Sequence, residues 1–82
     1  MIVHDEAACR FNLKTPEGTA YVEYAVKGGI FTILHTIVPK PMEGRGLAAE
    51  LVSASVAWAE KEGLSVASVC SYADVWLKRH RP

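Results

Sequence analysis

Two glycines, Gly44 and Gly46, stand where an apolar segment gives way to a sequence with helical periodicity. The first-turn amides of a helix have no acceptors within the helix, and the macrodipole adds partial positive charge at that end. Glycines here let the backbone approach an anion without an intervening Cβ, and the small Ala48 and Ala49 keep the helix wall thin. The stretch therefore predicts a binding site for phosphate oxygens.

Two common nucleotide-binding signatures fit this loop poorly. The nucleotide P-loop is excluded because no Gly-Lys-Ser/Thr follows the glycines. The dinucleotide fingerprint G-x-G-x-x-G/A is formally met by Gly44, Gly46 and Ala49, but it also requires an acidic residue about 20 positions on, at the end of the next strand. Cys70 and Ser71 occupy that strand end instead, so the dinucleotide reading is the weaker alternative.

Three further side chains could take part in a reaction. Cys70 is either a reactive thiol or a buried core residue. His35 interrupts an apolar run, where it would act as a base or be a core histidine with a backbone partner. Tyr72 could donate a proton or simply pack on the sheet. His4 and His80 lack a third ligand at metal spacing, so no metal site is predicted.

These residues need a scaffold, and the first half of the chain reads as three strands. Alternating side chains predict half-buried strands at residues 9–14 and 20–26, and Gly28-Gly29 is a hairpin signal. Residues 30–38 are apolar on both faces and predict a central strand that stops at Pro39. One face is expected to carry Ile30, Leu34 and Val38, and the other Phe31, Ile33 and Ile37.

From Gly44 onward the apolar period changes from that of a strand to that of a helix, and Gly63 ends the pattern. Residues 64–70 are small and apolar and predict a strand parallel to 30–38, because a crossover helix separates the two. Residues 72–79 predict a short closing helix. The expected fold is α/β with a mixed sheet in the order β-β-β-α-β-α, with three antiparallel strands and one parallel crossover.

Length and charge limit the function further. At 82 residues, the chain is expected to form one domain spanning 1–82. Nine basic and nine acidic residues give no net charge, which disfavours nucleic acid as a partner. No apolar run is long enough to cross a membrane. Two distant cysteines and no leader pattern predict a cytoplasmic protein with free thiols.

The loop is similar to the acyl-coenzyme A pyrophosphate loop of the GNAT acetyltransferases, Q/R-x-x-G-x-G/A. Glu43, Gly46 and Ala48 match that motif except at the first position, where Glu replaces Gln or Arg. Almost the whole chain resembles the small, minimal GNAT-like family, described as GCN-related with a functional cysteine. The ordered pieces that carry this resemblance are Val3-His4, Arg10-Phe11, Ala20 to Tyr24, His35 to Pro39, the glycine loop, Cys70-Ser71-Tyr72 and His80.

The resemblance implies an N-acetyltransferase that binds acetyl-coenzyme A and transfers the acetyl group to an unidentified amine. Thr36 and Val38 would pair with the pantetheine amides, and Cys70, Tyr72 and His35 are the candidate catalytic residues. The alternative is a coenzyme A-binding or acyl-sensing module without turnover. Because only a short turn joins the first two strands, the acceptor side is either open or completed by a second copy in a homodimer. The loop residues assigned to the cofactor are Glu43, Gly44, Arg45, Gly46, Leu47, Ala48 and Ala49.

Overall fold

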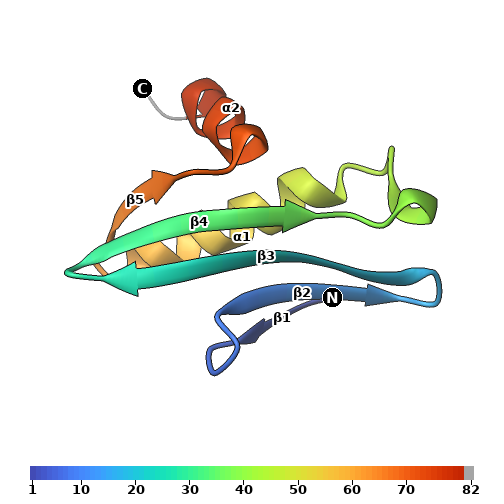
Figure 1. The fold of residues 1–82 in the computed structure, drawn as a ribbon, viewed down its shortest axis with the longest axis horizontal. Coiled ribbons are helices and arrows are strands. Elements are labelled where there is room, and N and C mark those ends of the chain that lie inside the picture. Colours follow the sequence, from blue (N-terminus) through green and yellow to red (C-terminus); the bar gives the residue numbers. More distant parts are fainter. Residues whose placement is uncertain (81–82) are drawn as a thin grey trace.

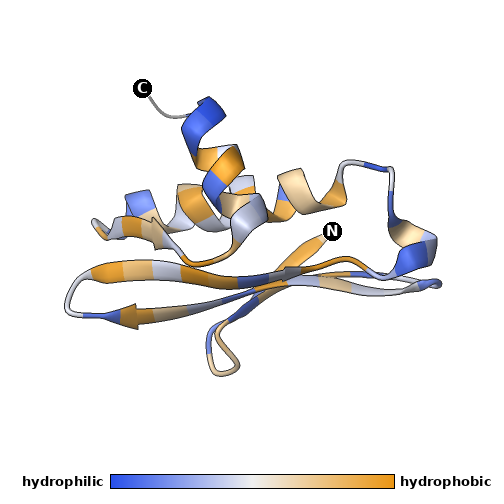
Figure 2. Ribbon diagram, turned by 45° about the horizontal axis from the view of Figure 1, so that its top comes forward, coloured by the Kyte–Doolittle hydropathy of each residue, from blue (hydrophilic) through white to orange (hydrophobic). Residues whose placement is uncertain are grey.

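The computed structural model describes residues 1–80, in which strands that follow one another in the chain also lie side by side in one sheet (Figure 1). The sheet order is β1-β2-β3-β4-β5, and both α-helices lie on the same side of it (Figure 2). The elements are β1 (Ile2–Asp5), β2 (Arg10–Thr15), β3 (Gly18–Lys27), β4 (Ile30–Ile37), the 3-10 helix η1 (Lys40–Met42), α1 (Leu47–Lys61), β5 (Ser65–Ser68) and α2 (Ser71–His80).

The mixed α/β sheet is confirmed. Strands β1 to β4 are antiparallel to their neighbours, and β5 pairs with β4 in parallel after the α1 crossover. The expected element order is incomplete, because β1 precedes the three antiparallel strands. This edge strand escaped detection because its pattern is inverted: Val3 is 56% exposed, whereas the ring of His4 turns inward and stacks on Phe11 with centroids 3.9 Å apart.

The core lies between α1 and the face of β2, β3 and β4 that the helix covers. The α1 side chains Leu51, Val52 and Val56 are buried there at the helical spacing that the sequence predicts. α2 adds a single buried residue, Ala73. The largest fully buried side chains are Phe31, Ile33, Met42, Leu51, Val22, Val52 and Ser55.

β4 departs from its predicted pattern, and the departure shapes the site. The register between β3 and β4 shifts by one residue, because Glu23 pairs with His35 whereas Tyr24 pairs with Ile33. Leu34 is the extra residue, so β4 carries a β-bulge there. Before the bulge, Phe31 and Ile33 face α1.

After the bulge, the even-numbered residues face the helix side. The expected partition of β4 into two faces is therefore wrong beyond Ile33, because the bulge brings Val38 to the same side as Phe31 and Ile33. The expectation that residues 30–38 form a central strand is confirmed, because β4 lies between β3 and β5. Its second apolar face, however, is not covered. Ile30 and Ile37 remain 45% and 43% exposed on the face that no helix covers.

No helix among residues 1–80 is both long enough and apolar enough to cross a membrane.

Candidate functional site

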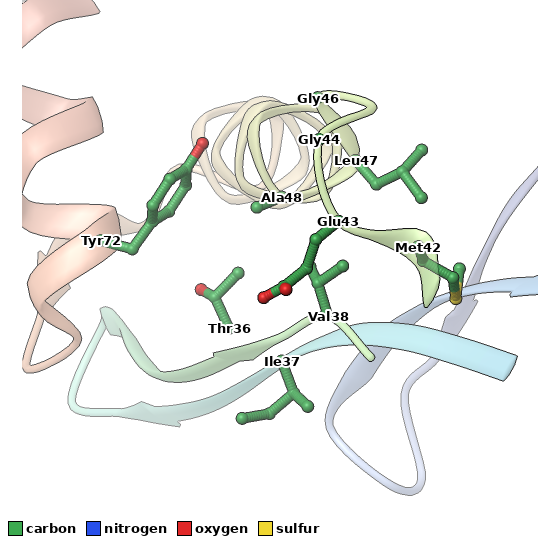
Figure 3. A pocket seen from close by; sticks show the side chains of 10 residues that line it. All are labelled: Thr36, Ile37, Val38, Met42, Glu43, Gly44, Gly46, Leu47, Ala48 and Tyr72. Carbon is green, nitrogen blue, oxygen red and sulfur yellow. The ribbon is translucent and has the colours of Figure 1, made fainter. Parts of the chain in front are cut away.

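A cavity of about 550 Å³ opens where the end of β4, the glycine loop and the first turns of α1 and α2 meet (Figure 3). Strand, loop and both helices all contribute to its wall, so residues far apart in the sequence come together there. Its lining residues are Thr36, Ile37, Val38, Met42, Glu43, Gly44, Gly46, Leu47, Ala48 and Tyr72.

The cavity exists because β4 and β5 separate before β4 ends. Their parallel pairing ends at Ile33 and Ser68, and the last hydrogen bond between the two backbones is the one that the Val69 N–H donates to the Ile33 carbonyl at 3.0 Å. The chain then turns into α2, whereas β4 continues to Ile37. Beyond Ile33, the edge of β4 on the β5 side therefore has no strand beside it.

The bulge in β4 aims two predicted residues into this space. In Figure 3, Thr36 and Val38 point toward the helix side, whereas Ile37 between them points away. Without the extra residue Leu34, the alternation that buries Phe31 and Ile33 would turn Thr36 and Val38 to the opposite face.

The glycine loop takes a conformation that requires its glycines. Gly44 and Gly46 have φ values of +82° and +73°, in the left-handed region. A Cβ at either position would meet no atom within 4 Å, so the space beside the loop is open. Gly46 caps α1 without a side-chain hydrogen bond. The first-turn amides of α1 are thus free of any side-chain cap and border the cavity.

The loop is anchored at its start by Met42, which is fully buried. Backbone bonds reinforce this turn: the Met42 N–H donates to the Pro39 carbonyl at 2.9 Å, and the Glu43 N–H donates to the Lys40 carbonyl at 3.1 Å. Met42 is a lining residue that sequence reasoning missed. Its only signal was an apolar side chain placed between prolines and glycines.

The charged side chains around the loop do not all face the cofactor cavity, as the assignment of Arg45 to the cofactor had led us to expect. The Glu43 side chain points into the cavity (Figure 3). Arg45 lies outside the lining and instead makes a bidentate pair with Glu17, with Nη1–Oε1 and Nη2–Oε2 distances of 2.7 and 2.6 Å. No lysine or arginine stands among the lining residues.

Cys70 lies beside the cavity, behind Thr36. Its sulfur and the Thr36 hydroxyl oxygen are hydrogen-bonded at 3.5 Å. The Ser68 hydroxyl fixes the Cys70 backbone, accepting from its N–H at 3.0 Å and donating to its carbonyl at 2.9 Å. Cys70 directly precedes α2, and the Asp74 N–H donates to its carbonyl at 2.9 Å.

The surroundings of Cys70 favour the thiolate. Burial raises the pKa of the thiol, but hydrogen bonds from the Thr36 side chain and from the backbone of Ala73, Tyr72 and Thr36 lower it more, so the pKa lies below its ordinary value. This is the effect expected for a cysteine at a helix N-terminus.

The structure brings eight of the twelve predicted site residues to the cavity wall. Tyr72 is one of them and stands at the start of α2, 42% exposed. His35 is exposed on the uncovered face of the sheet, opposite Glu23. Ala49 lines a different hollow, between α1 and Trp76. Arg45, Ala49, Cys70 and His35 therefore lie outside the lining, although Cys70 touches it through Thr36.

Among residues 1–80, no three His, Cys, Asp or Glu side chains gather closely enough to hold a metal ion.

Comparisons with known proteins identify the family and the fold. A profile of the GCN5-related N-acetyl-transferase family matches residues 10–82. The fold is similar to the solution structure of a GCN5-like candidate N-acetyltransferase from Staphylococcus aureus, with a TM-score of 0.75 and 27% sequence identity. The match covers 96% of this chain and 78% of the other. The chain belongs to the GCN5-related N-acetyl-transferase family.

Proposed function

We propose that the protein binds acetyl-coenzyme A in the cavity and transfers the acetyl group to an amine. The observation that carries this proposal is the set of uncapped α1 amides behind Gly44 and Gly46, in a cavity that leads to Tyr72 and Cys70. Family membership supports a transferase in preference to a module that only binds coenzyme A.

The loop suits a diphosphate. Open space beside Gly44 and Gly46 admits phosphate oxygens close to the backbone, and the N-terminal amides of α1 supply donors and partial positive charge. The residues that would hold the diphosphate are Gly44, Gly46, Leu47 and Ala48. Because Glu43 faces the same space and Arg45 is engaged elsewhere, the anion relies on backbone donors.

The pantetheine arm suits the free edge of β4. Beyond Ile33 this edge has backbone groups without a neighbouring strand, and an extended ligand with amide groups can pair with them as a strand would. Thr36 and Val38 border this path. The arm would bring the thioester toward the Cys70 and Tyr72 end of the cavity.

The reacting groups are then Cys70 and Tyr72. The Cys70 thiolate attacks the thioester carbonyl carbon, the bond from that carbon to the coenzyme A sulfur breaks, and the departing thiolate takes a proton from the Tyr72 hydroxyl. The amine next attacks the acetyl carbon on Cys70. Its nitrogen loses one proton, Cys70 leaves as a thiolate, and Tyr72 regains its proton.

Calorimetry with acetyl-coenzyme A, paired with intact-protein mass spectrometry, tests this function. We expect saturable binding and a mass increase of one acetyl group that Cys70→Ser abolishes. Gly46→Asp should weaken binding by more than about tenfold, because it places a side chain and a negative charge where the phosphate oxygens belong.

Gly63→Asp is the matched control, because Gly63 has φ +74° at the other end of α1 and also has open space around its Cβ. It introduces the same backbone strain and the same charge away from the cavity and should leave binding unchanged. Absence of binding at millimolar acetyl-coenzyme A would refute the proposal. Tight binding without transfer to any of a panel of amines would instead favour a module that only binds.

A further inference from the structure

The Glu17–Arg45 pair joins two segments that the chain separates by 28 residues. Glu17 lies in the turn between β2 and β3, and Arg45 lies between the two glycines of the cavity loop. Both hydrogen bonds are short, at 2.7 and 2.6 Å, and together they give the parallel two-point geometry of a guanidinium on a carboxylate.

The turn that carries Glu17 is itself held in place. The Glu17 N–H donates to the Thr15 Oγ1 at 3.2 Å. The turn also lies against the segment that leads into the loop, because a Cβ added to Gly18 would stand 3.3 Å from the Pro39 Cγ and 3.7 Å from the Met42 Sδ. These contacts fix the position of the turn from which the Glu17 side chain extends.

Arg45 lies at the most flexible point of the loop sequence, between Gly44 and Gly46. A glycine on each side gives the loop backbone a wide choice of conformations, and that freedom must be lost when a ligand binds. Met42 fixes the loop at its start and α1 fixes it at its end. Between these two points, the ion pair with Glu17 gives the loop a side-chain contact outside its own segment.

We propose that Glu17 is a positioning residue, which holds Arg45 and thereby keeps the Gly44–Gly46 loop in the conformation that presents the α1 amides to the cavity. The inference rests on the proposed function for the nature of the ligand. Glu17 itself touches neither the cavity nor, on this view, the cofactor, and Arg45 acts through the loop backbone.

A double-mutant cycle measured by calorimetry with acetyl-coenzyme A tests this role. Glu17→Gln and Arg45→Gln should each weaken binding by about three- to fivefold, the upper range for an exposed ion pair. The double variant should bind acetyl-coenzyme A no more weakly than either single variant, because either substitution alone already breaks the ion pair. Exchanging the partners, in Glu17→Arg with Arg45→Glu, should restore binding to within about twofold.

Glu23→Gln is the matched control, because it removes the other ion pair of the described residues, Arg10–Glu23 at 3.7 Å on the open sheet face, and should not change binding. A loss in Arg45→Gln without one in Glu17→Gln would overturn the inference and place Arg45 on the cofactor directly. Tighter binding in Glu17→Gln would also overturn it, because the pair would then withhold Arg45 from the anion.

Amide hydrogen exchange tests the same role without any cofactor. Glu17→Gln should speed exchange at the Glu43 and Glu50 amides, which donate to the Lys40 and Gly46 carbonyls on either side of the loop, and leave the β1–β2 amides unchanged. Unchanged exchange at Glu43 and Glu50 would overturn the positioning role. The two measurements separate the hypotheses. A wild-type protein that binds no acetyl-coenzyme A removes the proposed function, and the exchange result then decides the role of Glu17 alone.

Discussion

At the scale of single residues, the groups around Cys70 set the acidity of its thiol. The sequence leaves its two roles open, because a small apolar strand end suits both a buried thiol and a nucleophile. Three features decide what the thiol can do: its place before α2, the Ser68 hydroxyl that fixes its backbone, and the Thr36 hydroxyl beside its sulfur. The Thr36 side chain and the backbone of Thr36, Tyr72 and Ala73 lower the thiol pKa in spite of burial.

Thr36→Val should slow alkylation of Cys70. The substitution keeps the shape of the side chain but removes the hydroxyl, so the pKa of Cys70 rises and the thiolate fraction near pH 7 falls. We expect the rate with iodoacetamide to drop about threefold at pH 7 and the rate–pH curve to move to higher pH. Peptide mass spectrometry would follow Cys70 separately from Cys9.

Thr32→Val provides the control for this measurement, because Thr32 lies on the same strand but alternates to the face away from α1. Its effect on the alkylation rate should be negligible. An unchanged rate–pH curve in Thr36→Val would mean that the helix amides alone set the acidity of the thiol.

At the scale of elements, the glycine loop was predictable and the bulge was not. Paired glycines before a helical period point to an anion site, and Gly44 and Gly46 adopt the left-handed conformations that explain their presence. The bulge at Leu34 leaves no comparable signal, because its neighbours are ordinary strand residues. Thr36 and Val38 were assigned through family resemblance, since periodicity alone mistakes their side of the sheet.

Glu43→Gln should tighten the binding of acetyl-coenzyme A. Glu43 points into a cavity whose lining holds no basic residue, so its carboxylate repels an anionic ligand. Removing that charge should lower Kd by about fivefold, or about 1 kcal/mol, the size of a charge interaction across a few ångströms of water. Calorimetry in low and high salt would show the gain shrinking as salt screens the charges.

Glu62→Gln makes the same charge change at the far end of α1 and should leave Kd unaffected. A weaker complex in Glu43→Gln would show that the carboxylate contributes to binding, for example by accepting a hydrogen bond from the ligand.

At the scale of the whole molecule, composition and periodicity were enough for the fold class but not for the complete sheet. The change from a strand period to a helical one at Gly44 correctly separates the antiparallel strands from the crossover. β1 was missed because one of its two inward residues, Ile2 and His4, is polar, although the His4 ring stacks on Phe11 as an apolar side chain would. The cavity is likewise a property of the assembled molecule, since it needs β5 to end before β4 does.

The whole fold depends on one layer of contacts between α1 and the sheet, so Leu51→Ala should destabilise all of it. Leu51 is fully buried in that layer, and such truncations cost about 2–5 kcal/mol. A domain of this length has roughly 4–12 kcal/mol in total, so the midpoint of thermal unfolding should fall by roughly 10 °C or more. Urea unfolding followed by circular dichroism measures the loss.

Val75→Ala is the control. It lies at a half-exposed position of α2 and should change stability by less than about 0.5 kcal/mol. A loss below about 1 kcal/mol for Leu51→Ala would mean that β-sheet pairing, and not the α1 layer, dominates the stability of this small domain.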